Sequence, residues 1–158
     1  MDLSGLSERA LALINSCGYG KQRLMSEDSI DECMAFYEEE GYRVSDEVKE
    51  IIDGFYMLSI GKHGTFKDGT FIITENQDIE NKMVVYPENI YEAAHLFKKL
   101  SDAMGDYIVP LGLINDDFIA IGDSGKIYII ADDVFIAGNS WTDFLNNFAD
   151  NFSSLKNH

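Results

Sequence analysis

Apolar positions are densest between residues 107 and 138, where short runs of Ile, Val, Phe and Tyr alternate with turn residues. Runs of this kind, separated by clusters of Asn, Asp and Gly, are typical of strands joined by hairpins. The pattern predicts four strands, at residues 107–114, 118–121, 126–131 and 134–137. We therefore expect an antiparallel meander, with the rest of the chain packed against it.

A second pattern, apolar residues spaced three and four positions apart, predicts helices before and after these strands. Residues suited to N-caps stand at their starts: Ser7, Ser29, Ser45, Asn89 and Ser140. The predicted helices span residues 6–17, 29–40, 45–55, 89–104 and 140–152. Further strands are predicted at 55–60, 70–74 and 83–86, and residues 61–69 are predicted to form a loop.

This order of elements indicates an α+β protein with a mainly antiparallel, twisted sheet and helices packed around it. With 158 residues, the chain is expected to form a single domain over residues 1–158. No apolar run is long enough to span a membrane, and the start of the chain lacks the basic region of a signal peptide. Cys17 and Cys33 suit neither a disulfide framework nor a zinc site, so we expect a reduced, cytoplasmic protein.

The charge is unusual, because 28 acidic residues face 12 Lys and Arg, which gives a net charge of −16 and a pI near 4.3. Such a field repels nucleic acids and anionic membranes, and it favours association with a basic protein. The alternative is that the acidity only keeps the protein soluble. Eleven acids lie between residues 27 and 53, and Glu38–Glu39–Glu40 stands at a predicted helix C-terminus, where the dipole disfavours negative charge. That cluster is either a solvated face or a binding surface.

The sequence holds no recognisable catalytic set. His63 lies in a predicted loop, where Asp68 is its one candidate acid–base partner, and His95 lies on a predicted helix at the edge of the buried face. The glycine-containing segment at 122–126 lacks the glycine and the Ser or Thr that a phosphate-binding loop requires, and it is predicted to be a turn.

Two pairs of acids in predicted turns, Asp116–Asp117 and Asp132–Asp133, raise the possibility of a hard cation. They lack the alternating spacing and distal Glu of a calcium-binding loop, and Asp is common in sheet turns for its own hydrogen bonding. We expect neither a metal nor a cofactor.

The order of elements and several short motifs resemble the SUKH superfamily, and most of all its third family. The motifs are a Gly-aromatic turn ending in Arg, a Gly-containing helix end, a Pro-x-Gly strand, an Asp-Gly-Tyr hairpin and a closing helix that follows a glycine. The corresponding residues here are Cys17 to Arg23, Glu40 to Tyr42, Pro110 to Gly112, Asp123 with Gly125 and Tyr128, and Gly138 to Leu145.

The resemblance implies a bacterial immunity protein, encoded beside a secreted polymorphic toxin that is often a nuclease or a deaminase. Such a protein would bind its cognate toxin and block the toxin's basic active-site cleft with an acidic surface, without catalysis. The sequence does not show whether the acids converge, but the expected partner-binding residues are Glu38, Glu39, Glu40, Asp116, Asp117, Asp132 and Asp133. The alternatives are a non-catalytic intracellular scaffold, as in eukaryotic relatives, and a hydrolase that uses His63. The toxin's identity and the oligomeric state stay open.

Overall fold

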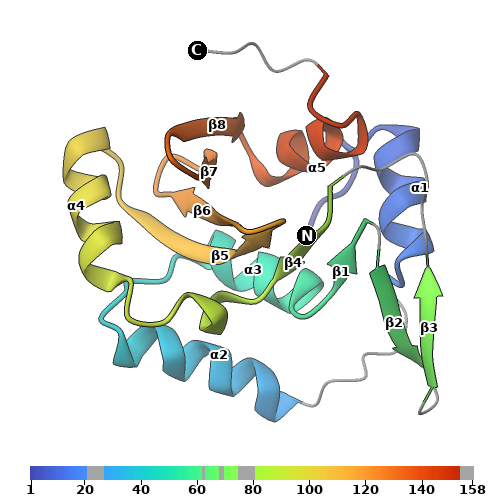
Figure 1. The fold of residues 1–158 in the computed structure, drawn as a ribbon, viewed down its shortest axis with the longest axis horizontal. Coiled ribbons are helices and arrows are strands. Elements are labelled where there is room, and N and C mark those ends of the chain that lie inside the picture. Colours follow the sequence, from blue (N-terminus) through green and yellow to red (C-terminus); the bar gives the residue numbers. More distant parts are fainter. Residues whose placement is uncertain (21–26, 62, 68–69, 75–80, 154–158) are drawn as a thin grey trace.

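The computed structural model describes residues 1–20, 27–61, 63–67, 70–74 and 81–153. Its main element is a six-stranded antiparallel sheet with the strand order β1-β4-β5-β6-β7-β8, and β2 and β3 form a separate hairpin (Figure 1). The α+β class with a mainly antiparallel sheet is thus confirmed. No helix in the described part of the chain is long and apolar enough to cross a membrane.

The predicted meander is confirmed, with boundaries that shift by at most one residue. Its strands are β5 (Ile108–Ile114), β6 (Asp117–Gly122), β7 (Ile127–Ile130) and β8 (Val134–Gly138). The sheet continues from β5 through β4 (Met83–Val85) to the two-residue edge strand β1 (Ser59–Ile60). Consecutive strands are neighbours throughout the meander, so each turn joins two strands at one end of the sheet.

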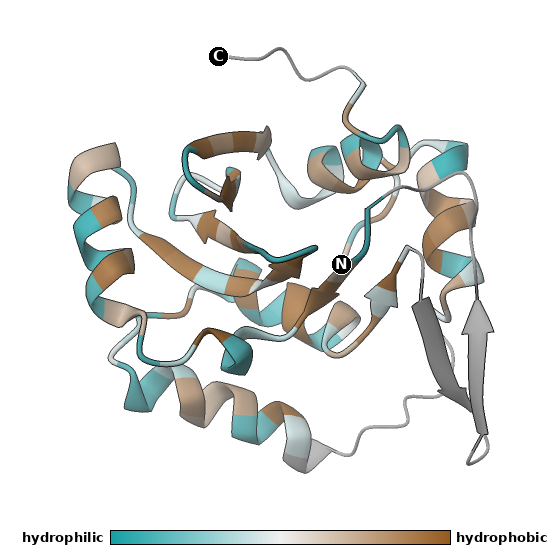
Figure 2. Cartoon of the chain, in the orientation of Figure 1, coloured by the Kyte–Doolittle hydropathy of each residue, from teal (hydrophilic) through white to brown (hydrophobic). Residues whose placement is uncertain are grey.

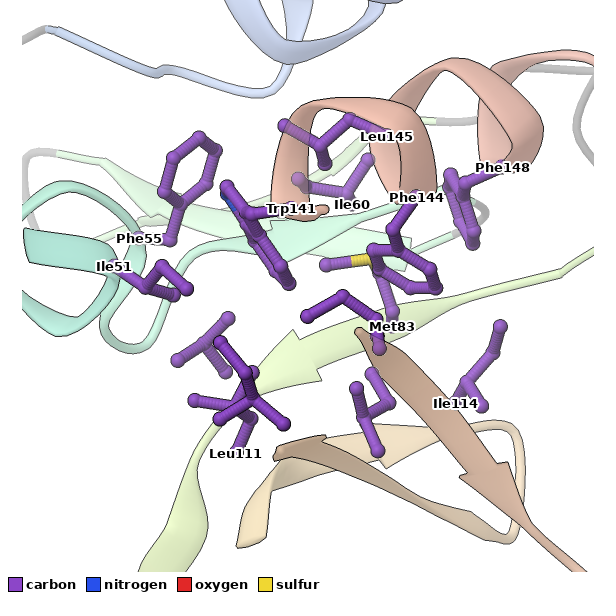
Figure 3. Packing of buried hydrophobic residues seen from close by; sticks show 14 of the residues in the cluster. Ile51, Phe55, Ile60, Met83, Leu111, Ile114, Trp141, Phe144, Leu145 and Phe148 are labelled. Carbon is purple, nitrogen blue, oxygen red and sulfur yellow. The ribbon is translucent and has the colours of Figure 1, made fainter. Parts of the chain in front are cut away.

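Helices cover both faces of this sheet. The larger core receives side chains from α1 (Glu8–Ser16), α2 (Glu27–Glu39), α3 (Asp46–Phe55) and α5 (Trp141–Ala149). A smaller core on the opposite face lies under α4 (Ala94–Met104) and the short 3-10 helix η1 (Pro87–Ile90). Figure 2 shows apolar residues along the central strands, and Figure 3 shows the aromatic residues of α5 packed on the larger core.

Several N-caps are confirmed in atomic detail. The side chains of Ser7, Ser45 and Ser140 each accept a hydrogen bond from the backbone N–H three residues later. Asp143 adds a second bond at the start of α5, because its carboxylate accepts from the backbone N–H of Asn139, the residue before the N-cap, at 2.8 Å. Ser29 is not a cap, since α2 begins two residues before it.

The predicted strand over residues 55–60 is wrong at its start, because α3 continues through Gly54 to Phe55. The ring of Tyr19 stacks on Phe55 with 4.7 Å between centroids, and it lies against Gly54. This tertiary packing holds a glycine in helical conformation where local propensity favours a turn. Only Ser59 and Ile60 form a strand.

The long predicted helix from residue 89 is divided. Pro87 starts η1, which ends at Ile90, and α4 begins at Ala94 without a side-chain cap. Between them Glu92 takes a left-handed φ of 61°, which a continuous helix does not allow. The capping role expected of Asn89 is therefore wrong, whereas the predicted left-handed C-cap at Gly105, with φ 69°, is confirmed.

The predicted loop over residues 61–69 contains a strand. β2 (His63–Lys67) pairs in antiparallel register with β3 (Thr70–Thr74), and their hairpin lies beside the β1 edge of the main sheet (Figure 1). The sequence of β2 is polar, contains glycine and shows no alternation of apolar and polar residues, so β2 has no strand signal of its own. Only the apolar β3 indicates a strand at this hairpin. Residues 21–23 of the family resemblance lie outside the described residues.

Candidate protein-binding surface

Two acidic turns lie at the same end of the main sheet. Asp116 and Asp117 belong to the β5–β6 hairpin, and Asp132 and Asp133 form the β7–β8 connection. Phe118 pairs with Ile130 across β6 and β7, so the two hairpins leave the sheet on the same side. We call Asp116, Asp117, Asp132 and Asp133 the acidic turns.

The carboxylates of the acidic turns are available to a partner. Asp116, Asp132 and Asp133 are exposed and Asp117 is half-buried. None of the four forms a side-chain hydrogen bond or an ion pair with any other residue that the structure describes. Asn115 instead holds the first turn in place: its backbone N–H donates to Lys82 O at 2.8 Å, and its left-handed φ of 52° suits asparagine.

The glutamates at the end of α2 lie elsewhere. Glu38 and Glu39 are exposed and Glu40 is half-buried, just before the turn at Gly41. Arg43 follows, and its guanidinium donates to Asp123 at 2.8 Å, in the β6–β7 turn. That turn is at the opposite end of β6 from the acidic turns.

The structure therefore divides the seven predicted contact residues into two separate groups. Glu38 borders an open depression of about 430 Å³ between α2 and α3, which Tyr37, Tyr42 and Val44 also line. Only the four aspartates of the acidic turns share one end of the sheet.

An apolar patch adjoins the acidic turns. Val134, Phe135 and Ile136 on β8 are 37%, 41% and 43% exposed, in the strand that ends the sheet. Figure 2 shows β8 as an apolar strand at the edge of the molecule. Exposed apolar residues that adjoin free charges are typical of protein-binding surfaces. The sequence predicted this strand but not that its side chains are exposed. The one signal for exposure was the position of the strand at the end of the meander, where a sheet edge is expected.

The opposite end of the sheet is fixed by its own hydrogen bonds. The Asp106 carboxylate accepts from the Ser124 backbone N–H at 3.1 Å, from the Ser124 hydroxyl at 2.5 Å and from the Tyr128 hydroxyl at 2.7 Å. Gly125 takes a left-handed φ of 86° in the same turn. The predicted turn at 122–126 is confirmed, and its polar groups are used within the fold.

Asp106 provides a pH-dependent contribution to stability. Partial burial alone raises the pKa of Asp106, but the hydrogen bonds from Ser124 and Tyr128 and the nearby Lys126 outweigh it, so the pKa lies below its ordinary value. We expect Asp106→Asn to lower the free energy of unfolding at pH 7 by about 1–2 kcal/mol, because a carboxylate that accepts several hydrogen bonds is lost. Urea denaturation of both proteins measures this difference.

The sign of the pH effect follows from the lowered pKa. The contribution is complete above the unfolded-state pKa of about 3.9 and is lost as pH falls through the lower pKa of the folded state. The difference between wild type and Asp106→Asn should therefore shrink below about pH 4. Asp102→Asn, on the exposed side of α4, is the matched control and should leave stability unchanged. A difference that is constant with pH would exclude the charge of Asp106 as the cause.

Other candidates for chemistry are not brought into a site. His95 is exposed on α4 and not at the edge of a buried face. The side chains of His63 and Asp68 lie outside the described residues. Burial raises the pKa of the Cys33 thiol, and the neighbouring Glu88 adds to the effect, so the thiol stays protonated at neutral pH. Within the described ranges, no three His, Cys, Asp or Glu residues are placed to hold a metal ion.

An α+β sheet with exposed carboxylates and an exposed apolar edge at one end is typical of the class of proteins that bind other proteins. Residues 7–151 match the model of the SUKH-3 immunity protein family. Because the match covers most of the chain, the protein belongs to this family. Neither a comparison with curated proteins nor one with solved structures gives a match.

Proposed function

We propose that this protein neutralises a cognate toxin domain by covering the toxin's basic active-site cleft with the acidic turns. Membership of an immunity protein family supports a toxin as the partner. The observation that carries the proposed site is the set of four carboxylates, unpaired among the described residues, at the end of the sheet where the exposed Val134, Phe135 and Ile136 begin. A nuclease or a nucleic-acid deaminase fits this surface best, because its cleft is basic in order to hold phosphates.

The physics of association agrees with this arrangement. A net charge of −16 accelerates encounter with a basic protein, and the carboxylates of the acidic turns give up no ion pair with any described residue when they bind. Close charge pairs across an interface couple by about 1.5–7 kcal/mol. The apolar patch supplies the buried, dehydrated contact that long-range attraction alone does not provide.

The first experiment is co-expression with the toxin domain that the neighbouring gene encodes. We expect rescue of growth and a stable complex that contains both chains. Binding without rescue would instead support the regulatory scaffold that the sequence leaves open. We place the complex in the cytoplasm, where a nuclease or deaminase meets its substrate and where Cys17 and Cys33 stay reduced.

Paired charge variants test which acids contact the toxin. Asp116→Ser with Asp117→Ser should slow association at least tenfold at low salt, because two carboxylates leave the binding surface. Glu38→Gln with Glu39→Gln removes the same charge at the end of α2, and it should change the rate much less. Stopped-flow association at low and physiological salt gives both numbers. Equal losses in the two variants would show that only total charge matters, and a larger loss at the glutamates would move the site to α2.

A further inference from the structure

The two edges of the main sheet differ. The β1 edge has only two residues, and the β2–β3 hairpin lies beside it (Figure 1). β8 has five residues, Val134–Gly138, and none of the residues that the structure describes pairs with its outer side. Natural edge strands are usually protected by lysine, proline or a covering element. Val134, Phe135 and Ile136 contain no such protection.

The hydrogen bonds of the neighbouring turns show which backbone groups of β8 face outward. Gly122 N–H donates to Lys126 O and Ala131 N–H donates to Asp133 O, both at 3.0 Å. Bonded and non-bonded pairs alternate along an antiparallel ladder. By this alternation Phe135 bonds to Ile129 of β7, whereas Val134 and Ile136 direct their N–H and C=O groups away from the sheet.

A strand added beside β8 would contact side chains on both faces of the sheet. Val134 pairs with Ile130 and Ile136 with Tyr128, whose side chains belong to the core under α4. Phe135 pairs with Ile129 and points to the other face. The three exposed residues of β8 thus continue the core layers to the edge of the sheet.

The open part of the edge has defined ends. Near the C-terminal end of β8, the side-chain amide of Asn147 on α5 donates to Ala137 O at 2.9 Å and covers the strand. At its start, Asp132 and Asp133 directly precede Val134, and Asp116 and Asp117 lie across β7 at the same end of the sheet. A strand that pairs here lies along three apolar residues and ends among aspartates.

We infer that the toxin domain contributes a β-strand that pairs with Val134 and Ile136, with Lys or Arg side chains at its end against the acidic turns. This inference rests on the proposed function and specifies its mode of recognition, in which backbone bonds give affinity and alternate side chains give specificity. Charge selects a basic strand over a second copy of this chain, because two copies would bring together two bodies of net charge −16.

Hydrogen exchange in the complex with the neighbouring toxin domain tests the pairing directly. We expect the amides of Val134 and Ile136 to exchange freely in the isolated protein and to slow at least tenfold in the complex. The amide of Phe135, already bonded to β7, should be protected in both states. This measurement needs no substitution, so it does not depend on how a variant folds.

Two variants test the same contact by affinity. Val134→Pro removes an outward N–H at the first residue of an edge strand, where proline is tolerated, and Ile136→Lys replaces an apolar contact with a positive charge beside the basic strand. Each should weaken toxin binding at least tenfold. Leu11→Lys, at an apolar residue of α1 with 39% exposure, is the matched control and should bind as wild type.

The outcomes separate the two proposals. Normal toxin binding with unprotected Val134 and Ile136 amides and unaffected variants would overturn strand addition and leave the immunity role standing. Absence of any complex would overturn both. A dimer of the isolated chain with these amides protected, seen by sedimentation, would show that the edge serves a second copy and would overturn the toxin-strand assignment.

Discussion

The Gly112→Ala variant is expected to lose more than about 3 kcal/mol of unfolding free energy, a large part of the roughly 5–15 kcal/mol that stabilises a typical domain. A Cβ at this position would lie 2.0 Å from Val84 O and 2.8 Å from Tyr86 N. Both atoms belong to the backbone at β4, so no side-chain rotation relieves the overlap. Strand β5 would have to separate from β4, which pairs with it at Val85 and Gly112.

Denaturant unfolding followed by the fluorescence of Trp141, the single tryptophan of the chain, measures this loss. Gly54→Ala is the matched control, because it adds the same methyl group in α3, where the nearest atom is a ring carbon of Tyr19 at 3.5 Å. That is an ordinary contact and alanine favours helix, so Gly54→Ala should be neutral or stabilising by up to about 1 kcal/mol. Similar effects at the two positions would contradict the close approach of β5 to β4.

The second large effect is expected at Phe144. Its ring is fully buried between Trp141, at 5.2 Å between centroids, and Phe148, at 6.2 Å (Figure 3). Phe144→Ala should cost about 3–5 kcal/mol, since it removes apolar contacts and leaves a cavity that the surrounding strands and helices fill only in part. Thermal and urea unfolding both report this change.

Phe135→Ala removes the same side chain from the exposed edge strand and serves as the comparison. It should change stability by less than about 1 kcal/mol, because its ring is 41% exposed. If strand addition at β8 is right, Phe135→Ala weakens toxin binding although it leaves the fold intact. A large stability loss at Phe135 would mean that β8 is part of the core and not an open edge.

Elements with strong local signals were predictable from the sequence. The strands of the meander are short apolar runs between Asn, Asp and Gly turns, and Ser7, Ser45 and Ser140 are caps because their side chains reach backbone N–H groups nearby. Elements that depend on distant contacts were not. Gly54 stays helical because Tyr19 packs on it, and β2 forms a strand because β3 pairs with it.

The candidate site was predictable only in part, for a related reason. The sequence identifies the aspartates of the acidic turns, but strand order alone places the turns at one end of the sheet and the α2 glutamates away from them. Exposure of Phe135 depends on β8 having no further neighbour, which no local pattern indicates. Apolar runs look the same in an edge strand and in a central one.

The motifs that carry the family resemblance have structural roles in this protein. Pro110 lies beyond the residues of β5 that pair with β4, so its missing N–H breaks no ladder there, and its C=O accepts from the Tyr37 hydroxyl at 2.5 Å. Tyr128 binds Asp106. Gly138 allows Phe144 close approach, since a Cβ there would lie 2.5 Å from the Phe144 nitrogen. These residues identify the fold, and none belongs to the acidic turns.

The far end of the sheet is held by the side chains of Asp106, Ser124, Tyr128 and the Arg43–Asp123 pair, whereas the four aspartate side chains of the acidic turns bond to no residue that the structure describes. One consequence concerns the retargeting of the protein. Replacing these four aspartates while keeping Asn115 should redirect it to a different toxin and leave its melting temperature almost unchanged, so new partners can be acquired by small, local replacements on a constant frame.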